Sequence, residues 1–210
     1  MKSYEVFDKF YDKYEKWYER HKIIAENELR ALEKIKSQGL GLEVGVGTGY
    51  FASRLGIQVG VDPSINMLKI ARKRNIEVVA AFGEKLPFKS SIFDFAYLIV
   101  TLCFVSNPVR VLNEIYRVLK PKGKLVVGFI PKDSSWGQYY LTKKDSPFYR
   151  VAKFYSKREV LDILARCGFK ARTFLSTLHF PPEGEPVLEE PKEDDKGGFL
   201  IVLAEKISKF

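Results

Sequence analysis

The most constraining feature of this sequence is a glycine-rich turn that follows a short apolar run. Residues 42–49 read Leu-Glu-Val-Gly-Val-Gly-Thr-Gly, and a second apolar run, from Gln58 to Val61, ends on Asp62. Glycines let a turn adopt positive φ and bring its backbone close to a ligand. An acid that ends the neighbouring strand can accept hydrogen bonds from both hydroxyls of a ribose. Together the two segments predict a pocket for an adenosine-containing cofactor.

After Gly39 the periodicity predicts an α/β fold. Helical stretches at about 49–56, 64–74 and 108–119 alternate with apolar runs at about 40–46, 57–61, 76–81, 93–100 and 123–130. This alternation is typical of a Rossmann-like, doubly wound, mostly parallel sheet with helices on both faces. Two later runs, Phe169–Ser176 and Gly198–Lys206, are joined by a loop without a helical pattern, so we expect them to be antiparallel. The prediction is a seven-stranded sheet with an antiparallel last strand.

We expect one domain over residues 1–210, with a cofactor-binding core at 38–130. Residues 1–37 predict an N-terminal helical cap, one helix or a helix pair, because aromatic and apolar residues recur at spacings of three and four: Phe7, Phe10, Tyr14, Trp17, His21 and Ile24. Two signals mark later helix starts, the pair Asn107-Pro108 and the capping box from Ser156 to Glu159.

Two segments lack helical periodicity. Residues 131–155 are rich in aromatics and leave the carboxyl end of a strand, where ligands bind in such sheets, so we expect a lid or substrate wall. Residues 177–197 form an acidic, proline-rich loop that we expect to be mobile, with His179 exposed at its start.

Composition narrows the possible partners. The formal net charge is +9, but Lys and Arg are scattered among Glu on helical segments, which favours a solvated surface over a nucleic-acid footprint. The longest apolar run, residues 95–105, is too short to cross a bilayer, and the first twenty residues do not resemble a secretory signal. Cys103 and Cys167 have no metal-ligand spacing. We therefore expect a cytoplasmic protein with free thiols and no metal; the oligomeric state is not indicated.

Several segments, in order, resemble the class I S-adenosylmethionine-dependent methyltransferases. The turn Glu43-Val-Gly45-Val-Gly47-Thr-Gly49 is similar to the family's first motif, and no Walker lysine or GxGxxG spacing replaces it. Further likenesses lie at 59–68, 83–88, 93–94 and 114–123. The resemblance covers roughly residues 38–130 and is strongest to the small-molecule branch that includes quinone methyltransferases.

The resemblance implies S-adenosylmethionine as the cofactor and assigns residues to it. The turn Gly45, Gly47 and Gly49 would pass under its methionine and ribose portions, and Glu43 would balance its amino group. Asp62 would hold the ribose hydroxyls. Pro63 and Met67 would lie beside the adenine, with Gly83 and Glu84 at its edge. The residues implied at the methionine part are Leu98, Ile99 and Val100. Simple core packing is an equal alternative for Met67, Leu98 and Val100.

Two departures from the family pattern concern the adenine and the acceptor. Phe82 stands where many relatives have an acidic or small polar residue, and Cys103-Phe104 replace a histidine pair. His21 fits a packed structural imidazole better than a general base, whereas Tyr14 or Trp17 is expected to reach the pocket.

The resemblance implies in-line methyl transfer to an N, O or C nucleophile of a small molecule. Two alternatives remain, because no general base is evident and the chain is basic: a cofactor-binding regulatory module without catalysis, and an RNA methyltransferase.

Overall fold

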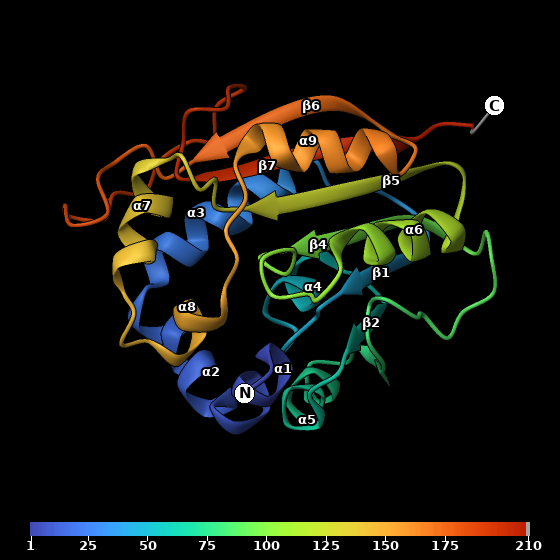
Figure 1. The fold of residues 1–210 in the computed structure, drawn as a ribbon, viewed down its shortest axis with the longest axis horizontal. Coiled ribbons are helices and arrows are strands. Elements are labelled where there is room, and N and C mark those ends of the chain that lie inside the picture. Colours follow the sequence, from blue (N-terminus) through green and yellow to red (C-terminus); the bar gives the residue numbers. More distant parts are fainter. Residues whose placement is uncertain (209–210) are drawn as a thin grey trace.

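One twisted sheet runs through the middle of the molecule (Figure 1). The computed structural model describes residues 1–208, and within this range seven strands form one sheet in the order β3-β2-β1-β4-β5-β7-β6. Neighbouring strands from β3 to β5 are parallel, whereas β7 is antiparallel to both β5 and β6. The predicted fold class is therefore confirmed. The strands are β1 (Gly41–Val44), β2 (Val59–Asp62), β3 (Glu77–Ala80), β4 (Phe93–Ile99), β5 (Leu119–Phe129), β6 (Phe169–Thr177) and β7 (Phe199–Lys206).

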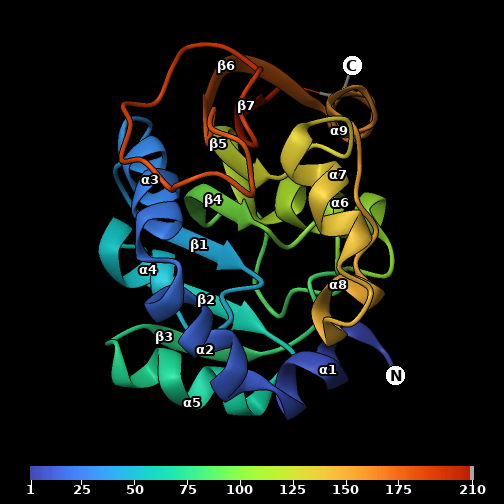
Figure 2. The ribbon, with the colours of Figure 1, turned by 90° about the vertical axis from the view of Figure 1, so that its left-hand side faces the viewer.

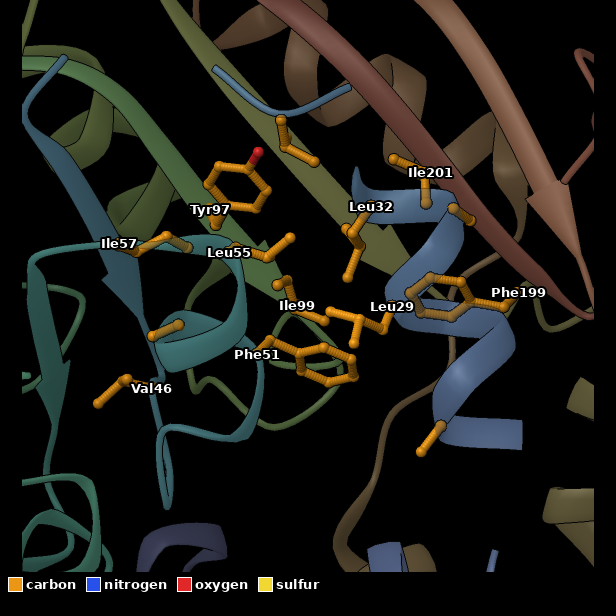
Figure 3. Packing of buried hydrophobic residues seen from close by; sticks show 14 of the residues in the cluster. Leu29, Leu32, Val46, Phe51, Leu55, Ile57, Tyr97, Ile99, Phe199 and Ile201 are labelled. Atoms are coloured by element: carbon orange, nitrogen blue, oxygen red, sulfur yellow. The ribbon is translucent and has the colours of Figure 1, made fainter. Parts of the chain in front are cut away.

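Helices cover both faces of this sheet and bury separate apolar clusters. On one face lie α6 (Pro108–Val118) and α9 (Lys157–Arg166), with Val111, Ile115 and Leu164 in the cluster. The other face is covered by α3 (Lys22–Glu33), α4 (Tyr50–Leu55) and α5 (Ile65–Lys73). Figure 3 shows side chains of α3 and α4 packed against β4 and β7, namely Leu29, Leu32, Phe51, Leu55, Tyr97, Ile99, Phe199 and Ile201. The sheet is thus rigidly supported from both sides.

The predicted helix starts are confirmed at two caps. The Asn107 side chain accepts a hydrogen bond from the backbone N–H of Arg110 over 3.0 Å, and Pro108 opens α6. At α9 the Ser156 hydroxyl accepts from the N–H of Glu159 over 3.2 Å, and the Glu159 carboxylate accepts from the N–H of Ser156 over 2.7 Å. These bonds satisfy backbone donors that a helix leaves unpaired at its start.

The N-terminal cap consists of three helices instead of the expected one or two. They are α1 (Ser3–Lys9), α2 (Tyr11–Arg20) and α3. The backbone leaves helical geometry at Phe10 and His21, whose ψ angles are 29° and 44°. These breaks let α1 and α2 turn away from α3, so that α1 contacts α5 and α8 (Pro147–Val151) (Figure 2).

The segment 131–155 contains helices that its sequence pattern did not indicate. They are α7 (Ser135–Thr142) and α8. Ser134 caps α7 by accepting a hydrogen bond from the N–H of Gly137 over 3.0 Å. Both helices are too short to show a clear period of 3.6 residues, which explains why the periodicity missed them.

The loop 177–197 is fastened to the body, although the sequence predicts mobility. Ser176 and Lys192 exchange backbone hydrogen bonds, and Asn27 of α3 bonds the backbone of Val187 and Glu189. The side chain of His179 is only 17% exposed, because it lies between Glu189 and Asp194. The expectation of an exposed His179 is therefore wrong.

None of the helices within residues 1–208 is both long enough and apolar enough to pass through a bilayer. Cys103 is a free thiol, and Cys167 is buried.

The cap of α9 allows a direct test of helix stability. We expect Ser156→Ala to lower the free energy of unfolding by about 1 kcal/mol, because the N–H of Glu159 loses its acceptor. Ser146→Ala is the matched control, since Ser146 begins α8 without a side-chain capping bond. Urea denaturation of both variants measures the difference; equal losses would contradict it.

Candidate functional site

The three glycines of the turn after β1 have different structural roles. All three have positive φ: 75° at Gly45, 52° at Gly47 and 77° at Gly49. A Cβ at Gly45 would lie 2.3 Å from the Thr101 side chain, and one at Gly49 would lie 2.4 Å from Ile76. At Gly47 the nearest atom would be 3.7 Å away, on the Tyr14 ring. Gly45 and Gly49 therefore allow close packing, whereas Gly47 borders open space that a ligand can occupy.

Asp62 connects this turn to the end of β2. Its Oδ2 accepts a hydrogen bond from the N–H of Gly47 over 3.0 Å, and its Oδ1 accepts from the N–H of Ser64 over 2.8 Å. Burial raises the pKa of the Asp62 carboxyl to about 6. Each carboxylate oxygen can accept a further hydrogen bond, so Asp62 can also bind a pair of ligand hydroxyls.

A cavity of about 190 Å³ lies beside Asp62, at the carboxyl ends of β1, β2 and β4. The open α/β fold places ligands at this edge. The cavity brings together most of the residues that the sequence assigned to the cofactor: Tyr14, Gly45, Gly47, Asp62, Pro63, Met67, Gly83, Glu84 and Val100. Apolar side chains, a carboxylate and open backbone are the features that a nucleoside requires.

Four assigned residues do not line this cavity. The side chains of Leu98 and Ile99 are 0% and 4% exposed and lie in the two apolar clusters, so they do not face the methionine part as expected. Gly49 packs against Ile76. Glu43 is 2% exposed, and its Oε2 has no hydrogen-bond partner. Burial, with the nearby charge of Asp62, raises the pKa of the Glu43 carboxyl well above its usual value.

The start of the chain covers the cavity, and the sequence pattern did not identify these residues. Ser3, Tyr4 and Phe7 of α1 belong to its wall. The Ser3 hydroxyl donates a hydrogen bond to the Phe104 carbonyl over 2.6 Å, and the Tyr4 and Phe82 rings meet edge to face at 5.1 Å. The aromatic stripe of residues 1–37 was the sequence signal for these residues, but it could not show which face of α1 lies toward the cavity.

Glu84 has a structural role besides lining the cavity. Its Oε1 accepts hydrogen bonds from the backbone N–H groups of Ser106 and Asn107, over 3.0 and 3.1 Å. Glu84 thus fixes the segment after β4 that forms one wall of the cavity.

A second, larger cavity of about 580 Å³ adjoins the first. Both cavities are lined by Phe7, Tyr14, Val100 and Phe104. Segment 131–155 forms much of the second cavity through α7 and α8, as its predicted role requires, whereas loop 177–197 contributes Pro182. Eight further wall residues are aromatic: Trp17, Tyr18, Phe51, Trp136, Tyr139, Tyr140, Phe148 and Tyr149.

His21 and Glu28 are the other notable side chains of this second cavity. The His21 ring stacks on Trp17 at 4.6 Å, which fits the expected packed imidazole. Glu28 was not identified, although it continues the apolar stripe four residues after Ile24. A carboxylate at an apolar position was the signal that could have found it.

Comparison with known proteins identifies a methyltransferase domain. A family model described as a methyltransferase domain matches residues 42–127. A solved structure from Thermotoga maritima, described as a SAM-dependent methyltransferase and possible histamine N-methyltransferase, is 38% identical, with a TM-score of 0.93 over 97% of this chain and 99% of that one.

Two sequence relatives also align over most of their length. An uncharacterized protein of Methanocaldococcus jannaschii is 42% identical over 203 residues, which cover 96% of this chain and 99% of the relative. A demethylmenaquinone methyltransferase of Oceanobacillus iheyensis is 26% identical over 90% of this chain and 83% of its own. With the glycine turn, Asp62 and the sheet order, these matches show that the chain belongs to the class I S-adenosylmethionine-dependent methyltransferases.

Proposed function

We propose that this enzyme transfers the methyl group of S-adenosylmethionine to a small molecule held in the second cavity. The observation that carries the proposal is the pair of adjoining cavities: the first has the features of a nucleoside site, and many aromatic side chains line the second. A volume of about 580 Å³ is ordinary for a small-molecule site. Two relatives, described as a demethylmenaquinone methyltransferase and a possible histamine N-methyltransferase, also point to small acceptors.

Residues of the first cavity would hold the cofactor. The Asp62 carboxylate would accept hydrogen bonds from the ribose hydroxyls, and the open space at Gly47 would admit the chain that carries the sulfonium. Pro63 and Met67 offer apolar contact to the adenine, and Gly83 offers backbone groups at its edge. Glu43 precedes the turn but lies outside this cavity, so we assign it no contact with the cofactor.

The bound cofactor supplies a methyl group that its sulfonium has already activated. The protein then needs to align an acceptor atom with that group and to exclude water. Tyr14, Phe7 and Phe104 line both cavities and would guide the acceptor toward the first. The N-terminal helices cover both cavities, which would keep solvent away from the reacting atoms.

The role of Asp62 can be tested by substitution. We expect Asp62→Ala to weaken binding of S-adenosylhomocysteine by about 1–3 kcal/mol, because two hydrogen bonds to a charged acceptor are lost. Asp133→Ala, at an exposed position outside the cavities, is the control. Calorimetric titration measures both affinities, and an unchanged affinity of Asp62→Ala would refute the ribose assignment.

The pH dependence of cofactor binding follows from the raised pKa of Asp62, about 6. Only the ionised carboxylate can accept from both hydroxyls, so we expect affinity for S-adenosylhomocysteine to be constant above pH 7. Below about pH 6 it should fall by up to tenfold per pH unit. Asp62→Asn should remove most of this dependence; titrations from pH 5 to 8 with the same slope in both proteins would contradict the assignment.

Transfer itself is tested with methyl-labelled S-adenosylmethionine. We expect label to appear in members of a panel of small amines, phenols and quinols, and not in tRNA or rRNA at moderate salt. Cofactor binding without transfer to any acceptor would favour the regulatory module. Label found only in RNA would favour the RNA methyltransferase.

A further inference from the structure

Glu28 is a buried acid without a partner. It lies in α3, is 3% exposed and lines the second cavity. No hydrogen bond or ion pair joins its carboxyl group to another residue within the described part of the chain. The adjacent Asn27 is equally buried, but its side chain bonds the backbone of Val187 and Glu189, over 2.8 and 2.9 Å. Buried charges in proteins are normally paired, so Glu28 lacks a partner that a ligand can supply.

Aromatic rings line the same cavity as this carboxyl group, among them Tyr14, Tyr18, Tyr140 and Tyr149. The Tyr14 and Tyr18 hydroxyls lie 2.8 Å apart, and the Tyr140 ring stacks on Tyr149 with centroids 4.5 Å apart. Burial, together with the charge of Glu28, raises the pKa of all four phenols and keeps them protonated. Four neutral hydroxyls and one acid therefore face the same space.

This combination selects for positive charge in a ligand. Aromatic faces attract cations, and one ring of the cavity already does so, since the ammonium of Lys143 lies 4.1 Å from the centroid of Tyr139. The remaining charged or titratable groups of the wall are Lys13, Arg20 and Asp145, which are exposed, and His21, which is half-buried. Within the described chain no cation is paired with Glu28, so an ammonium is the partner that would favour its ionised form, and nothing at Glu28 favours an anionic acceptor.

We propose that the methyl acceptor is a small organic amine, and that Glu28 binds its nitrogen among the rings of the second cavity. This inference rests on the proposed transfer to a small molecule and specifies its acceptor. An apolar or aromatic body would contact the ring walls, while the ammonium pairs with the carboxylate.

Glu28 is also suited to handle the proton of such an acceptor. An ammonium has no lone pair, so its nitrogen must lose a proton before it attacks a methyl group. Burial raises the pKa of the Glu28 carboxyl to about 8, which narrows the difference from the pKa of an alkylamine. The proton therefore passes from nitrogen to Glu28 more easily than it would to an ordinary carboxylate.

The step balances in atoms and charge. The N–H proton moves to the Glu28 carboxylate, and the freed lone pair forms an N–C bond to the methyl group. The S–C bond breaks, its electron pair remains on sulfur as a thioether, and the positive charge moves to the methylated nitrogen. When the product leaves, Glu28 returns the proton to water.

The experiment compares amines with neutral isosteres of the same shape. Protein saturated with S-adenosylhomocysteine is titrated with ethylamine, 2-phenylethylamine and tryptamine, and with 2-phenylethanol. We expect at least one amine to bind tenfold or more tightly than 2-phenylethanol. Glu28→Gln should lose that preference but keep its affinity for S-adenosylhomocysteine, whereas Glu28→Asp should keep part of it. Glu26→Gln, on the same helix and paired with Arg30, is the matched control.

The outcomes separate this inference from the proposed function. Equal binding of amines and alcohol, no binding of any amine, or full amine binding by Glu28→Gln would overturn it. Methyl transfer to a phenol or quinol that Glu28→Gln leaves unchanged would also overturn it while the proposed function stands. Amine binding through Glu28 without transfer to any acceptor would refute the proposed function, and with it the role of the amine as acceptor, and would leave Glu28 as an amine-binding residue only.

Discussion

The carboxylate of Asp62 accepts a hydrogen bond from the N–H of Gly47, and the rest of the site depends on this contact. It joins the turn after β1 to the end of β2 over 3.0 Å. Without a fixed turn, the open space at Gly47 would have no defined position relative to the sheet edge. The neighbouring strands hold both ends of the contact in place, because Val44 and Val61 are paired in register and fully packed. The rigid sheet thus holds Gly47, a residue with few conformational restrictions of its own, in one position.

The two cavities are built from different parts of the fold. Strand ends and the glycine turn form the first, and these belong to the segment that matches the methyltransferase domain, residues 42–127. Helices outside that segment, α2, α3, α7 and α8, form most of the second. Most of the second cavity therefore lies outside the segment that matches the family model, and its lining can change while the sheet stays the same.

The sequence predicted the sheet because each strand has a local signal, a short apolar run bounded by turn residues. It also placed Asp62 and Gly47 correctly at the sheet edge, since strand ends in this fold share one side. The prediction was wrong where it depended on the direction in which a side chain points. Leu98 and Ile99 end the right strand, but a strand alternates its side chains, and these two point into the two cores.

Tertiary contacts explain the other differences. The sequence around His179 predicts a surface residue. In the structure, Glu189 and Asp194, which come ten or more residues later in the loop, contact both nitrogens of its ring. Glu28 lines the second cavity only because α7 and α8, more than a hundred residues later in the chain, form the rest of its wall. In the sequence, Glu28 is one acid among several on a helix. No local pattern contains that information.

The position of α1 has a consequence for the order in which this molecule assembles. Asp8 accepts hydrogen bonds from the Ser64 hydroxyl and the N–H of Asn66, and Ser3 reaches the carbonyl of Phe104. All three partners follow α1 in the chain, the last of them by about a hundred residues. Because these contacts join segments that are far apart in the sequence, α1 docks only after Ser64, Asn66 and Phe104 have reached their places in the fold.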